Sequence, residues 1–557
     1  MPDTNDAVKA AWTFRAATLA ACGVLSAAWL AWSGWAQGQR DADWSPLLEL
    51  SIVDAETGAP IAARFSVVVD GSPHEPRWVG PHGYRFVSVH VSKRQTEVAL
   101  YARGTGPVIV PLTPQARRAT VAVVKGLDYL PVTVEAPVTG ESIRVTARLQ
   151  RWNRLREKGW RAADAHLHYD RLEPSGDRDW FAMMAGDDIS HGQFMTLKGG
   201  MVPGVWAHQF ALGDRGQATV AGRTIVAGQE YRDRLQGHVL LFGLGEIIQP
   251  IMAGVPDDPH NFPTLADVMR RARASGGMAG IAHGGNLGGN PTAIADVVLG
   301  TVEFMEIANW GWEFWPLENW YQLLSAGFIL PVTAGTDLPN NPRREPWQPF
   351  LGGMRTYVRT RGTGGPLPWN ASVRRGETFV TSGPVLEIEA NGAGPGGTVC
   401  LPSQGGGVSV TATMRSPRAL GRLEIVKDGT VDTVADISRQ RDGVWQIDLQ
   451  AQVRFRRSGW IAVRGSGADG DLLGRSAVAH SSAIRVIVGG KPIWSEAVAA
   501  SLTAELQGLR DYYRRNGKYR TERDRREVWE TFDRAIGMLA APSSGGDATE
   551  GSPCAEN

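Results

Sequence analysis

The sequence has almost no excess of either charge and very few cysteines. Lys and Arg total 58 against 57 Asp and Glu, which leaves a net charge of +1, and no long basic run stands out. This balance argues against a nucleic acid as the main partner. Of the three cysteines, Cys400 and Cys554 lie beyond the N-terminal segment. They could pair in an oxidising compartment, although the sequence alone does not place them near each other.

Three common catalytic motifs are also missing. The chain contains no G-x-S-x-G elbow and no P-loop, and no G-x-G-x-x-G follows an expected strand. Their absence excludes the usual serine hydrolases, NTPases and dinucleotide-binding enzymes. At 557 residues the chain is too long for one ordinary domain, and we expect three or four. Because 43% of the residues are hydrophobic, the chain can bury real cores.

The first 40 residues have the composition of a targeting segment. Lys9 and Arg15 precede residues 16–36, an uncharged run rich in Ala, Leu and Trp. The run is typical of a secretory signal with a candidate cleavage site at Ala36, and it is long enough to span a bilayer uncleaved. We therefore expect residues 1–40 to be a signal peptide or membrane anchor and the sole membrane contact. The body is expected to be exported, that is, periplasmic, secreted or anchored to the outer face of the membrane.

Changes in the pattern of hydrophobic and turn residues divide the rest of the chain into regions. Short β runs broken by turn residues predict an antiparallel sandwich, alternating strands and helices predict a β/α barrel, and short β runs then return as a second sandwich. Two amphipathic helices follow as a hairpin, and we expect a disordered polar tail. The predicted fold class is thus α/β plus all-β. The boundaries are 45–150 for the first sandwich, 159–383 for the barrel, 384–490 for the second sandwich, 493–540 for the hairpin and 541–557 for the tail.

Candidate ligands recur at the ends of the strands expected in the barrel. Strand alternation places Asp164, His166 and His168 on one face, and two imidazoles two residues apart can bind a divalent metal. Histidines that merely hydrogen-bond on a half-buried strand are the alternative for so short a pattern. Other expected strands begin or end next to His238, His283, Asn309 and Asp337. In a β/α barrel such residues gather at the C-terminal face, where the chemistry takes place.

Seven motifs occur in a characteristic order. They are D-A-H-L-H (164–168), G-Q-E-Y (228–231), G-H-V-L-L-F-G-L (237–244), I-A-H-G (281–284), M-E-I-A-N (305–309), A-G-T-D (334–337) and R-R-G-E-T-F-V-T-S-G-P-V-L (374–386). This set resembles the PHP metallohydrolase domain and, more narrowly, the CehA/McbA family related to carbaryl hydrolase. The preceding sandwich is similar to a carboxypeptidase-regulatory-like domain. The resemblance implies an exported hydrolase of amide, carbamate or ester bonds, and the wider PHP group adds phosphoesters.

Carried over onto this sequence, the resemblance implies a set of metal ligands. They are His166, His168, Glu230, His238, His283 and Asp337. Imidazoles and carboxylates suit zinc, manganese or iron, and we expect one or two ions, bridged by Glu230 if there are two. A metal ion makes water a nucleophile near neutral pH, so Glu230 is also a catalytic candidate. The expected partner is a small-molecule substrate.

Two motifs depart from the family pattern. Residues 185–191 (A-G-D-D-I-S-H) stand where the family has a T-D-H triplet, and we expect Asp188 to substitute as a ligand with His191 as a catalytic neighbour. The last motif is usually S-D-x-H, but here no histidine follows Asp337 at that spacing. These departures imply fewer metals, a different metal or lost activity. The alternative function is therefore a cell-envelope binding or scaffolding protein with a degenerate, non-catalytic PHP barrel.

A tryptophan-rich segment, 309–320, follows the M-E-I-A-N motif. One interpretation is an aromatic wall at the mouth of the pocket, with Asn309 and Trp310 as substrate-binding residues. The other is a helix that packs its rings on the barrel. The substrate itself is not given by the sequence, because pocket loops decide it and the fold does not.

Overall fold

The computed structural model describes most of the chain beyond the N-terminal segment. The described residues are 45–90, 95–169, 171, 173–198, 205–206, 209–254, 258–285, 290–309, 317–338, 349–360, 366–468, 477–540 and 554. The expected signal or anchor, Trp310 and the tail apart from Cys554 lie outside this part of the chain. Within these ranges, no helix combines the length and apolar character needed to cross a membrane.

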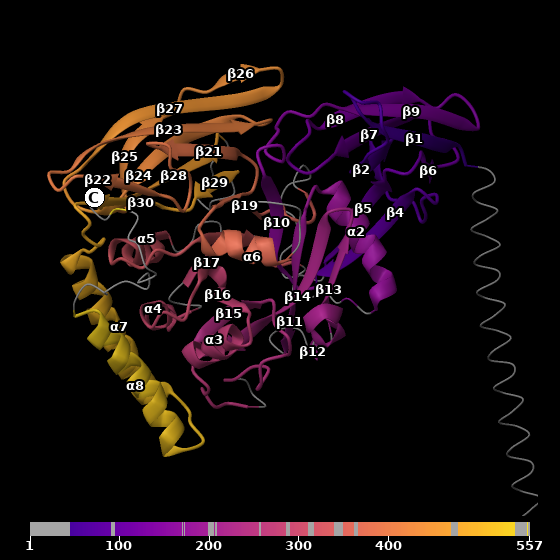
Figure 1. Ribbon diagram of the computed structural model, residues 1–557. Helices are drawn as coiled ribbons and strands as arrows, with labels where there is room; N and C mark the ends of the chain where they lie inside the picture. The colour runs from indigo at the N-terminus through magenta and orange to yellow at the C-terminus, as the bar shows by residue number, and fades with distance from the viewer. Residues whose placement is uncertain are drawn as a thin grey trace, which may run out of the picture.

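The first sandwich has two sheets around a hydrophobic core of its own. Its strands are β1 (Leu47–Asp54), β2 (Ala62–Val69), β3 (Ser72–His74), β4 (Gly83–His90), β5 (Gln95–Arg103), β6 (Val108–Pro111), β7 (Arg118–Val124), β8 (Val132–Pro137) and β9 (Ser142–Leu149). One sheet has the order β6-β1-β9 and the other β4-β5-β2-β7-β8, with β3 paired to β2 (Figure 1). Along β1, alternate residues are buried, as expected for a strand with one face on a core.

One pairing in this sandwich corrects the sequence prediction. β1 pairs with β9 in parallel over its whole length, from Leu47 opposite Ser142 to Asp54 opposite Leu149. The sandwich is therefore not wholly antiparallel. Alternation of apolar residues shows which face of a strand is buried, but it does not show which strand lies alongside.

A curled, mixed sheet forms the centre of the molecule. Its strands are β10 (Trp160–Leu167), β11 (His191–Lys198), β12 (Val205–Trp206), β13 (Gln217–Val220), β14 (Arg223–Asp233), β15 (Gly237–Phe242), β16 (Met278–Ile281), β17 (Phe304–Asn309), β18 (Val332–Gly335), β19 (Arg355–Arg359) and β20 (Thr378–Thr381). β10, β11 and β14 are parallel, as are β16, β17 and β18, whereas β15 is antiparallel to both its neighbours. A bridge between Leu167 and Leu338 joins the end of β10 to the chain beyond β18.

Helices connect several of these strands. They are α2 (Asp177–Gly186), α3 (Leu265–Ala274), α4 (Ala293–Val298), α5 (Leu317–Ser325) and α6 (Pro366–Arg374). The predicted helix at α3 is confirmed: Thr264 caps it by accepting a 3.1 Å hydrogen bond from the Asp267 nitrogen, and Val268 and Met269 are buried. The central region is thus mixed α/β, with parallel strands that end in one place.

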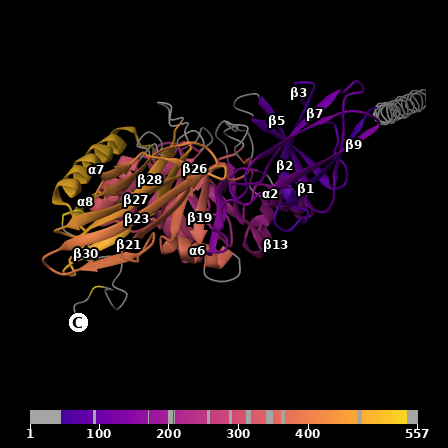
Figure 2. The ribbon, with the colours of Figure 1, turned by 90° about the horizontal axis from the view of Figure 1, so that it is seen from above.

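The second sandwich shares both its sheet and its core with the central region. One layer contains β21 (Val385–Ala390), β23 (Gly406–Ser416), β26 (Arg439–Arg441) and β27 (Val444–Phe455). The other contains β22 (Thr398–Leu401), β24 (Leu420–Lys427), β25 (Thr430–Ala435), β28 (Gly459–Gly467), β29 (Val478–Ser481) and β30 (Ile484–Val488). It continues the central sheet because β29 pairs with β20. The two sandwiches lie on opposite sides of the molecule (Figure 2).

The chain then forms a helical hairpin. Its helices are α7 (Glu496–Asn516) and α8 (Glu522–Met538), and a capping box between Thr521 and Asp524 starts the second. Beyond the hairpin, Cys554 is disulfide-bonded to Cys400 on β22, with the two Cα atoms 5.4 Å apart. The pairing that the sequence left open is therefore present in the structure.

Candidate metal centre

Two histidines of the candidate site lie at the end of β10. His166 lies on the strand and His168 directly follows it; both are buried, and their Nε2 atoms are 2.9 Å apart. β18 passes so close that a Cβ on Gly335 would lie 2.5 Å from the His166 nitrogen, so glycine is needed there. Two Nε2 atoms directed at one place are an arrangement that suits a metal ion.

Two carboxylates approach the same place from two other strands of the sheet. Glu230 is buried on β14, and its Oε2 lies 3.0 Å from His168 Nε2 and 3.7 Å from His166 Nε2. Asp337 lies two residues beyond β18, and its Oδ1 is 3.1 Å from His168 Nε2 and 3.7 Å from His166 Nε2. The structure therefore brings together four residues that are far apart in the sequence and that the sequence selected.

Asp164 holds the loop that carries Asp337. Its carboxylate accepts hydrogen bonds from Thr336 Oγ1 at 2.7 Å, from the Thr336 nitrogen at 3.0 Å and from the Gly352 nitrogen at 2.8 Å. Asp337 itself has a φ of 55°, a left-handed conformation that is uncommon outside glycine. Burial raises the pKa of Asp164 to about 6, although these donors oppose the shift. Asp164 thus fixes backbone beside the site.

His238 and His283 complete the cluster on its more open side. His283 follows β16 with a φ of 53°, and its Nε2 is 3.9 Å from Glu230 Oε1 and 3.7 Å from Asp337 Oδ2. His238 is the second residue of β15, and its Nδ1 is 3.0 Å from Glu230 Oε1. Within the described part of the chain, no hydrogen bond reaches the buried His283 Nε2. Buried polar atoms normally have partners, so this nitrogen fits a bound cation.

Glu306 on β17 is a site residue that the sequence analysis did not select. Its Oε1 is 3.0 Å from His166 Nδ1, and its Oε2 accepts a 2.8 Å hydrogen bond from the His283 nitrogen. A carboxylate on the far nitrogen of an imidazole fixes the ring and directs the other nitrogen outward. The signal was present, because Glu306 is the one charged residue of the M-E-I-A-N segment, with apolar residues on both sides of it.

Neighbouring charges control the protonation of the cluster. Burial would lower the pKa of His166, but Glu306 and the other carboxylates outweigh it and raise that pKa well above its ordinary value. Burial would raise the pKa of Glu230, but Arg232 and the adjacent histidines hold it well below the usual range. Burial lowers the pKa of His283 to about 3. His283 is therefore neutral at physiological pH, the state that metal binding requires.

The donor set fits a divalent metal ion. Imidazole nitrogens and carboxylate oxygens are ligands for zinc, manganese and iron. Three overlapping groups bring their donor atoms within 4.8 Å of one another: His166, His168 and Glu230; His166, His283 and Glu306; and Glu230, His238 and His283. We call the seven residues, including Asp337, the metal centre. Their individual roles as ligands remain predictions.

Asp188 is not part of the metal centre. It precedes β11 and has a φ of 56°, so it lies at the start of that strand, whereas the ligands gather where β10 and β18 end. Its Oδ1 is 3.9 Å from Arg156 Nη1. Burial opposes ionisation, but Lys125 and other cations hold the pKa of Asp188 well below its usual range. The structure does not group Asp188 with the residues of the metal centre, and its role as a substitute ligand stays a prediction.

His191 also lies away from the ligands. Its ring stacks on Trp369 with centroids 4.5 Å apart and planes at 7°, and its Nε2 is 2.9 Å from Gln193 Nε2. Burial lowers the pKa of His191 to about 3. No contact between His191 and the metal centre is present among the described residues. The structure does not group His191 with the metal centre, because the ring faces an aromatic partner, and its catalytic role stays a prediction.

The two predicted substrate-binding residues have different outcomes. Asn309 is buried at the end of β17, and neither polar atom of its amide has a hydrogen-bond partner in the described ranges. Trp310 and most of the tryptophan-rich segment fall outside those ranges. Trp320 is described: it is fully buried in α5 and donates a 3.0 Å hydrogen bond to the Leu330 carbonyl. For Trp320 the packing interpretation holds.

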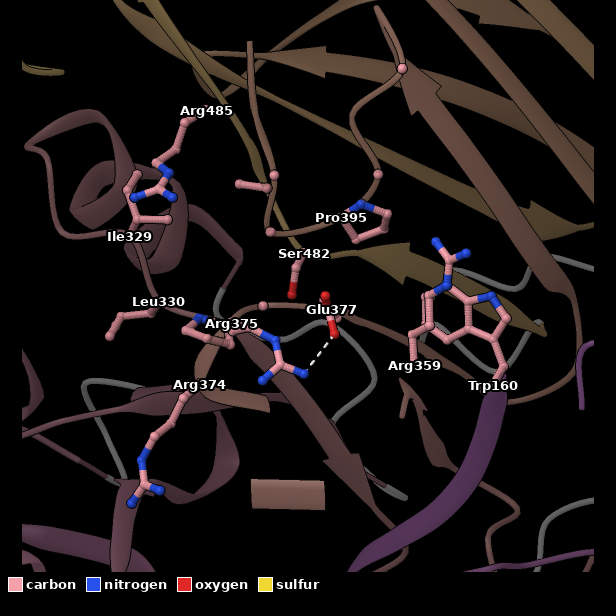
Figure 3. A pocket seen from close by; sticks show the side chains of 17 residues that line it. Trp160, Ile329, Leu330, Arg359, Arg374, Arg375, Glu377, Pro395, Ser482 and Arg485 are labelled. Atoms are coloured by element: carbon pink, nitrogen blue, oxygen red, sulfur yellow. Dashed lines mark hydrogen bonds and ion pairs between the residues drawn. The ribbon is translucent and has the colours of Figure 1, made fainter. Parts of the chain in front are cut away.

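A separate pocket of about 720 Å³ opens at the start of β10, on the opposite end of that strand from His166 (Figure 3). Trp160 and Arg359 line one side, and Arg375 lies across from them with its guanidinium 3.0 Å from Glu377. Its described lining residues include no histidine. The pocket therefore lacks the donor set found in the metal centre.

Comparisons with known proteins leave the family open. No known family profile matches the chain, and no curated protein matches it. Among solved structures it is similar to PsfC from Pseudomonas syringae PB-5123, with 14% identity, a TM-score of 0.27, and coverage of 38% of this chain and 89% of that chain. It is also similar to the lesion-specific endonuclease PfuEndoQ from Pyrococcus furiosus, with 12% identity, a TM-score of 0.24, and coverage of 39% and 56%.

A further similarity is to Endonuclease Q in complex with a duplex substrate that carries an abasic lesion at the active site. Identity is 14%, the TM-score is 0.22, and coverage is 39% of this chain and 56% of that chain. The chain thus spans about half the length of either endonuclease structure. Scores this low establish neither a shared fold nor a shared function, and we base the proposed function on the metal centre.

Proposed function

We propose that the protein is a metal-dependent hydrolase of the PHP type, within the CehA/McbA-like group. The observation that carries the proposal is the convergence of buried imidazole and carboxylate atoms within 4.8 Å of one another, in three groups that share Glu230, His166 and His283. Such a set of nitrogen and oxygen donors from four strands is typical of a site for a divalent metal ion. The motif resemblance supports the PHP assignment, and the curled mixed sheet is compatible with it.

The residues of the centre have separable tasks. When bound, a divalent metal ion supplies Lewis acidity and an activated water molecule. Glu230, whose pKa is held well below its usual range, is ionised at neutral pH and so acts as a ligand and not as a proton donor. Glu306 orients His166 and the turn of His283. His238 is 30% exposed, which marks the side from which a substrate approaches.

The proposed substrate is a small molecule with an amide, carbamate or ester bond, with a phosphoester as a further candidate. The resemblance supplies this bond class. The balanced charge of the chain and the absence of a long basic run support a small molecule over a nucleic acid. The buried amide of Asn309, which has both a donor and an acceptor to offer, is the proposed substrate contact.

We also propose that the body of the protein is exported. The uncharged run 16–36 behind Lys9 and Arg15 is the sequence argument. The bond between Cys400 and Cys554 supports it, because disulfides persist in oxidising compartments. A reporter that is active only beyond the membrane, fused after Ser45, should be active. An inactive reporter with normal expression would contradict export, and the mass of the mature chain distinguishes cleavage from anchoring.

A cell-envelope binding or scaffolding protein is the second candidate. The specific observation in its favour is that the second strand of the central sheet contributes no described ligand, since Asp188 and His191 both face other partners. The histidine expected after Asp337 is also absent from the sequence. A centre that has lost ligands can retain a metal ion and a binding surface without turnover.

One experiment separates the two functions. The protein without residues 1–40 is reconstituted with zinc, manganese or iron(II), and bound metal is counted by elemental analysis. The same samples are tested on nitrophenyl esters, carbamates and phosphoesters, which release nitrophenolate, and on nitroanilides, which release nitroaniline. We expect bound metal and hydrolysis of one bond class. Bound metal with no hydrolysis in the panel favours the binding protein, and no metal under any condition refutes both the centre and the hydrolase.

A further inference from the structure

The pocket at the start of β10 has walls from three parts of the chain. Trp160 and Arg359 come from the paired strands β10 and β19, Arg374 and Arg375 from the end of α6 and the residue after it, and Arg485 from β30. Figure 3 shows Arg359 beside Trp160, and the other three arginines across the pocket from them. The volume of about 720 Å³ is that of a small-molecule site, for which about 300 to 1,000 Å³ is usual. The pocket thus lies where the central region meets the second sandwich.

Close backbone contacts hold the walls of this pocket together. Gly376 follows α6 and Gly396 follows β21, and their φ values are 72° and 77°. A Cβ on Gly396 would collide with the Arg375 carbonyl oxygen, so glycine is needed there. The Gly396 nitrogen also donates a 3.1 Å hydrogen bond to the Ala483 carbonyl, which joins this loop to the segment before β30. The cavity is therefore built into the fold, and a ligand would not have to order these loops.

Arginine side chains dominate the charge of the lining. Four of the described lining residues are arginines, and Glu377 is the one carboxylate among them. Glu377 pairs with Arg375 at 3.0 Å, and Glu303, which does not line the pocket, pairs with Arg374 at 2.7 Å. Arg359 is exposed at the end of β19, and no ion pair to it is present in the described part of the chain. Its guanidinium is therefore available to an anion.

Guanidinium groups restrict the chemistry of the ligand. Each presents a planar fork of N–H donors that matches a carboxylate or a phosphate, and positive charges in a concave site attract anions. Because Arg359 and Arg375 line opposite sides of the cavity, a ligand with two or more anionic groups can contact both sides at once (Figure 3). The ring of Trp160 lies on the same side as Arg359 and offers an apolar contact to the carbon skeleton of such a ligand.

We infer that this pocket is a second binding site, separate from the metal centre, for a small organic anion that carries at least two carboxylate or phosphate groups. The inference does not rest on the proposed hydrolase. Arg359 and the arginines opposite bind the anionic groups, and Trp160 contacts the carbon skeleton. A ligand bound there touches the central region and the second sandwich together, so it stabilises the folded protein and raises its melting temperature.

Equilibrium binding of model anions tests the inference. The purified full-length protein, kept in a non-ionic detergent, is first freed of metal with a chelating resin, so that no anion binds through a metal ion. Citrate and fructose 1,6-bisphosphate are the probes, and acetate is the singly charged control, each titrated by calorimetry at constant ionic strength. We expect at least one probe to bind about 10-fold or more tightly than acetate. The tighter probe shows whether carboxylates or phosphates are preferred.

Two variants test the pocket by independent routes. Arg359→Met removes the exposed guanidinium and should weaken binding of the tighter probe by at least about 10-fold. Arg439→Met, which removes an exposed arginine of β26 outside the pocket, is the matched control and should bind as the wild type does. Gly394→Phe removes no charge, but it fills part of the cavity, because Gly394 lines the pocket and a Cβ there would meet nothing within 4 Å. It should also weaken binding by at least about 10-fold.

The remaining outcomes overturn the inference. They are binding of both probes no tighter than that of acetate, wild-type affinity in either folded pocket variant, and an equal loss of affinity in Arg439→Met. Thermal melts without anion show whether each variant folds, and if one pocket variant does not, the other decides. Because every sample is free of metal, these outcomes leave the hydrolase proposal to its own metal count.

Discussion

The molecule contains two buried clusters of charged side chains. They differ in the partners that surround the charged groups. The first is the metal centre at the ends of β10 and β18. The second, which we call the interface cluster, lies where the first sandwich meets α2 and the start of β11. It consists of Arg64, Tyr101, Lys125, Asp128, Asp187 and Asp188.

In the interface cluster the protein supplies the partners itself. Asp187 Oδ2 accepts hydrogen bonds from Tyr101 Oη at 2.7 Å and from the Leu351 nitrogen at 2.9 Å, and Arg64 Nε is 3.5 Å from the other oxygen. In the metal centre, by contrast, imidazole nitrogens and carboxylate oxygens converge within 4.8 Å of one another, and His283 Nε2 has no described hydrogen-bond partner. A buried carboxylate is thus no sign of function by itself. The convergence of several imidazoles on the same carboxylates is the feature that indicates a bound cation.

The strongest test of this contrast replaces a carboxylate in the metal centre. Glu230→Gln should lower metal affinity and turnover by at least about 100-fold, because an amide is a weak ligand, while the melting temperature of the metal-free protein changes little. Glu424→Gln is the matched control: this glutamate is also buried, but it pairs with Arg464 at 2.6 Å in the second sandwich. It should leave metal content unchanged. Wild-type metal affinity in Glu230→Gln would refute the assignment.

Asp296 shows a third arrangement, a buried carboxylate with no ion pair among the described residues. Thr292 Oγ1 donates a 2.7 Å hydrogen bond to it, and burial raises its pKa from 3.8 to about 7. Folding therefore takes up a proton between these pKa values, and the resulting stability is present at low pH and lost as the pH rises through 7. From pH 5 to pH 8 we expect this group to remove on the order of 2 to 3 kcal/mol of unfolding free energy.

Asp296→Asn should abolish that part of the pH dependence, because the amide does not titrate. Urea unfolding of both proteins at pH 5 and pH 8 provides the measurement. The wild type should lose more stability than Asp296→Asn between the two pH values. Equal losses would show that Asp296 is ionised in the folded protein.

A smaller effect is expected from the carboxylate that orients the histidines. Glu306→Gln should weaken metal binding by about 10- to 100-fold, because it loosens the turn of His283 and removes one negative charge from the centre. Competition with a chelating dye measures the affinity. Glu303→Gln, just before β17, is the control, since Glu303 pairs with Arg374 at 2.7 Å outside the centre. Equal affinities in the two variants would remove Glu306 from the centre.

The smallest effect should come from the interface cluster. Tyr101→Phe removes one hydrogen bond to Asp187 and should cost about 1 to 2 kcal/mol of unfolding free energy, with no change in metal content. Tyr84→Phe, which changes a half-buried tyrosine of the neighbouring strand, is the control and should cost less. If Tyr101→Phe lost metal instead of stability, the two clusters would not be independent.

The sequence could predict those metal-binding side chains that directly follow a strand. This is why it identified part of the metal centre. His166 and Asp337 lie where parallel strands end, and a helix between two such strands returns each end to the same edge. Arg232 was accessible by the same logic, because it alternates with Glu230 on one face of β14. Its contact with Glu230 is a local one, between residues two apart on one strand.

Asp188 shows where residue patterns fail. Asp187 and Asp188 resemble ligand carboxylates in the sequence, but the left-handed turn at Asp188 directs the chain into the start of β11 beside the first sandwich. Lys125, which interacts electrostatically with Asp188, belongs to the first sandwich. The sequence around Asp188 does not show that this lysine lies nearby. The parallel pairing of β1 with β9 was missed for the same reason, since strand neighbours are chosen by the fold as a whole.

The bond between Cys400 and Cys554 also determines the covalent topology of the molecule. It closes a ring across a sequence separation of 154, and this ring contains most of the second sandwich and both helices of the hairpin. Proteolysis at any single site inside the ring leaves one covalently connected molecule under oxidising conditions. Proteolysis in the first sandwich instead separates the chain into two fragments. A single cleavage therefore has different consequences in the first sandwich and in the region closed by the disulfide.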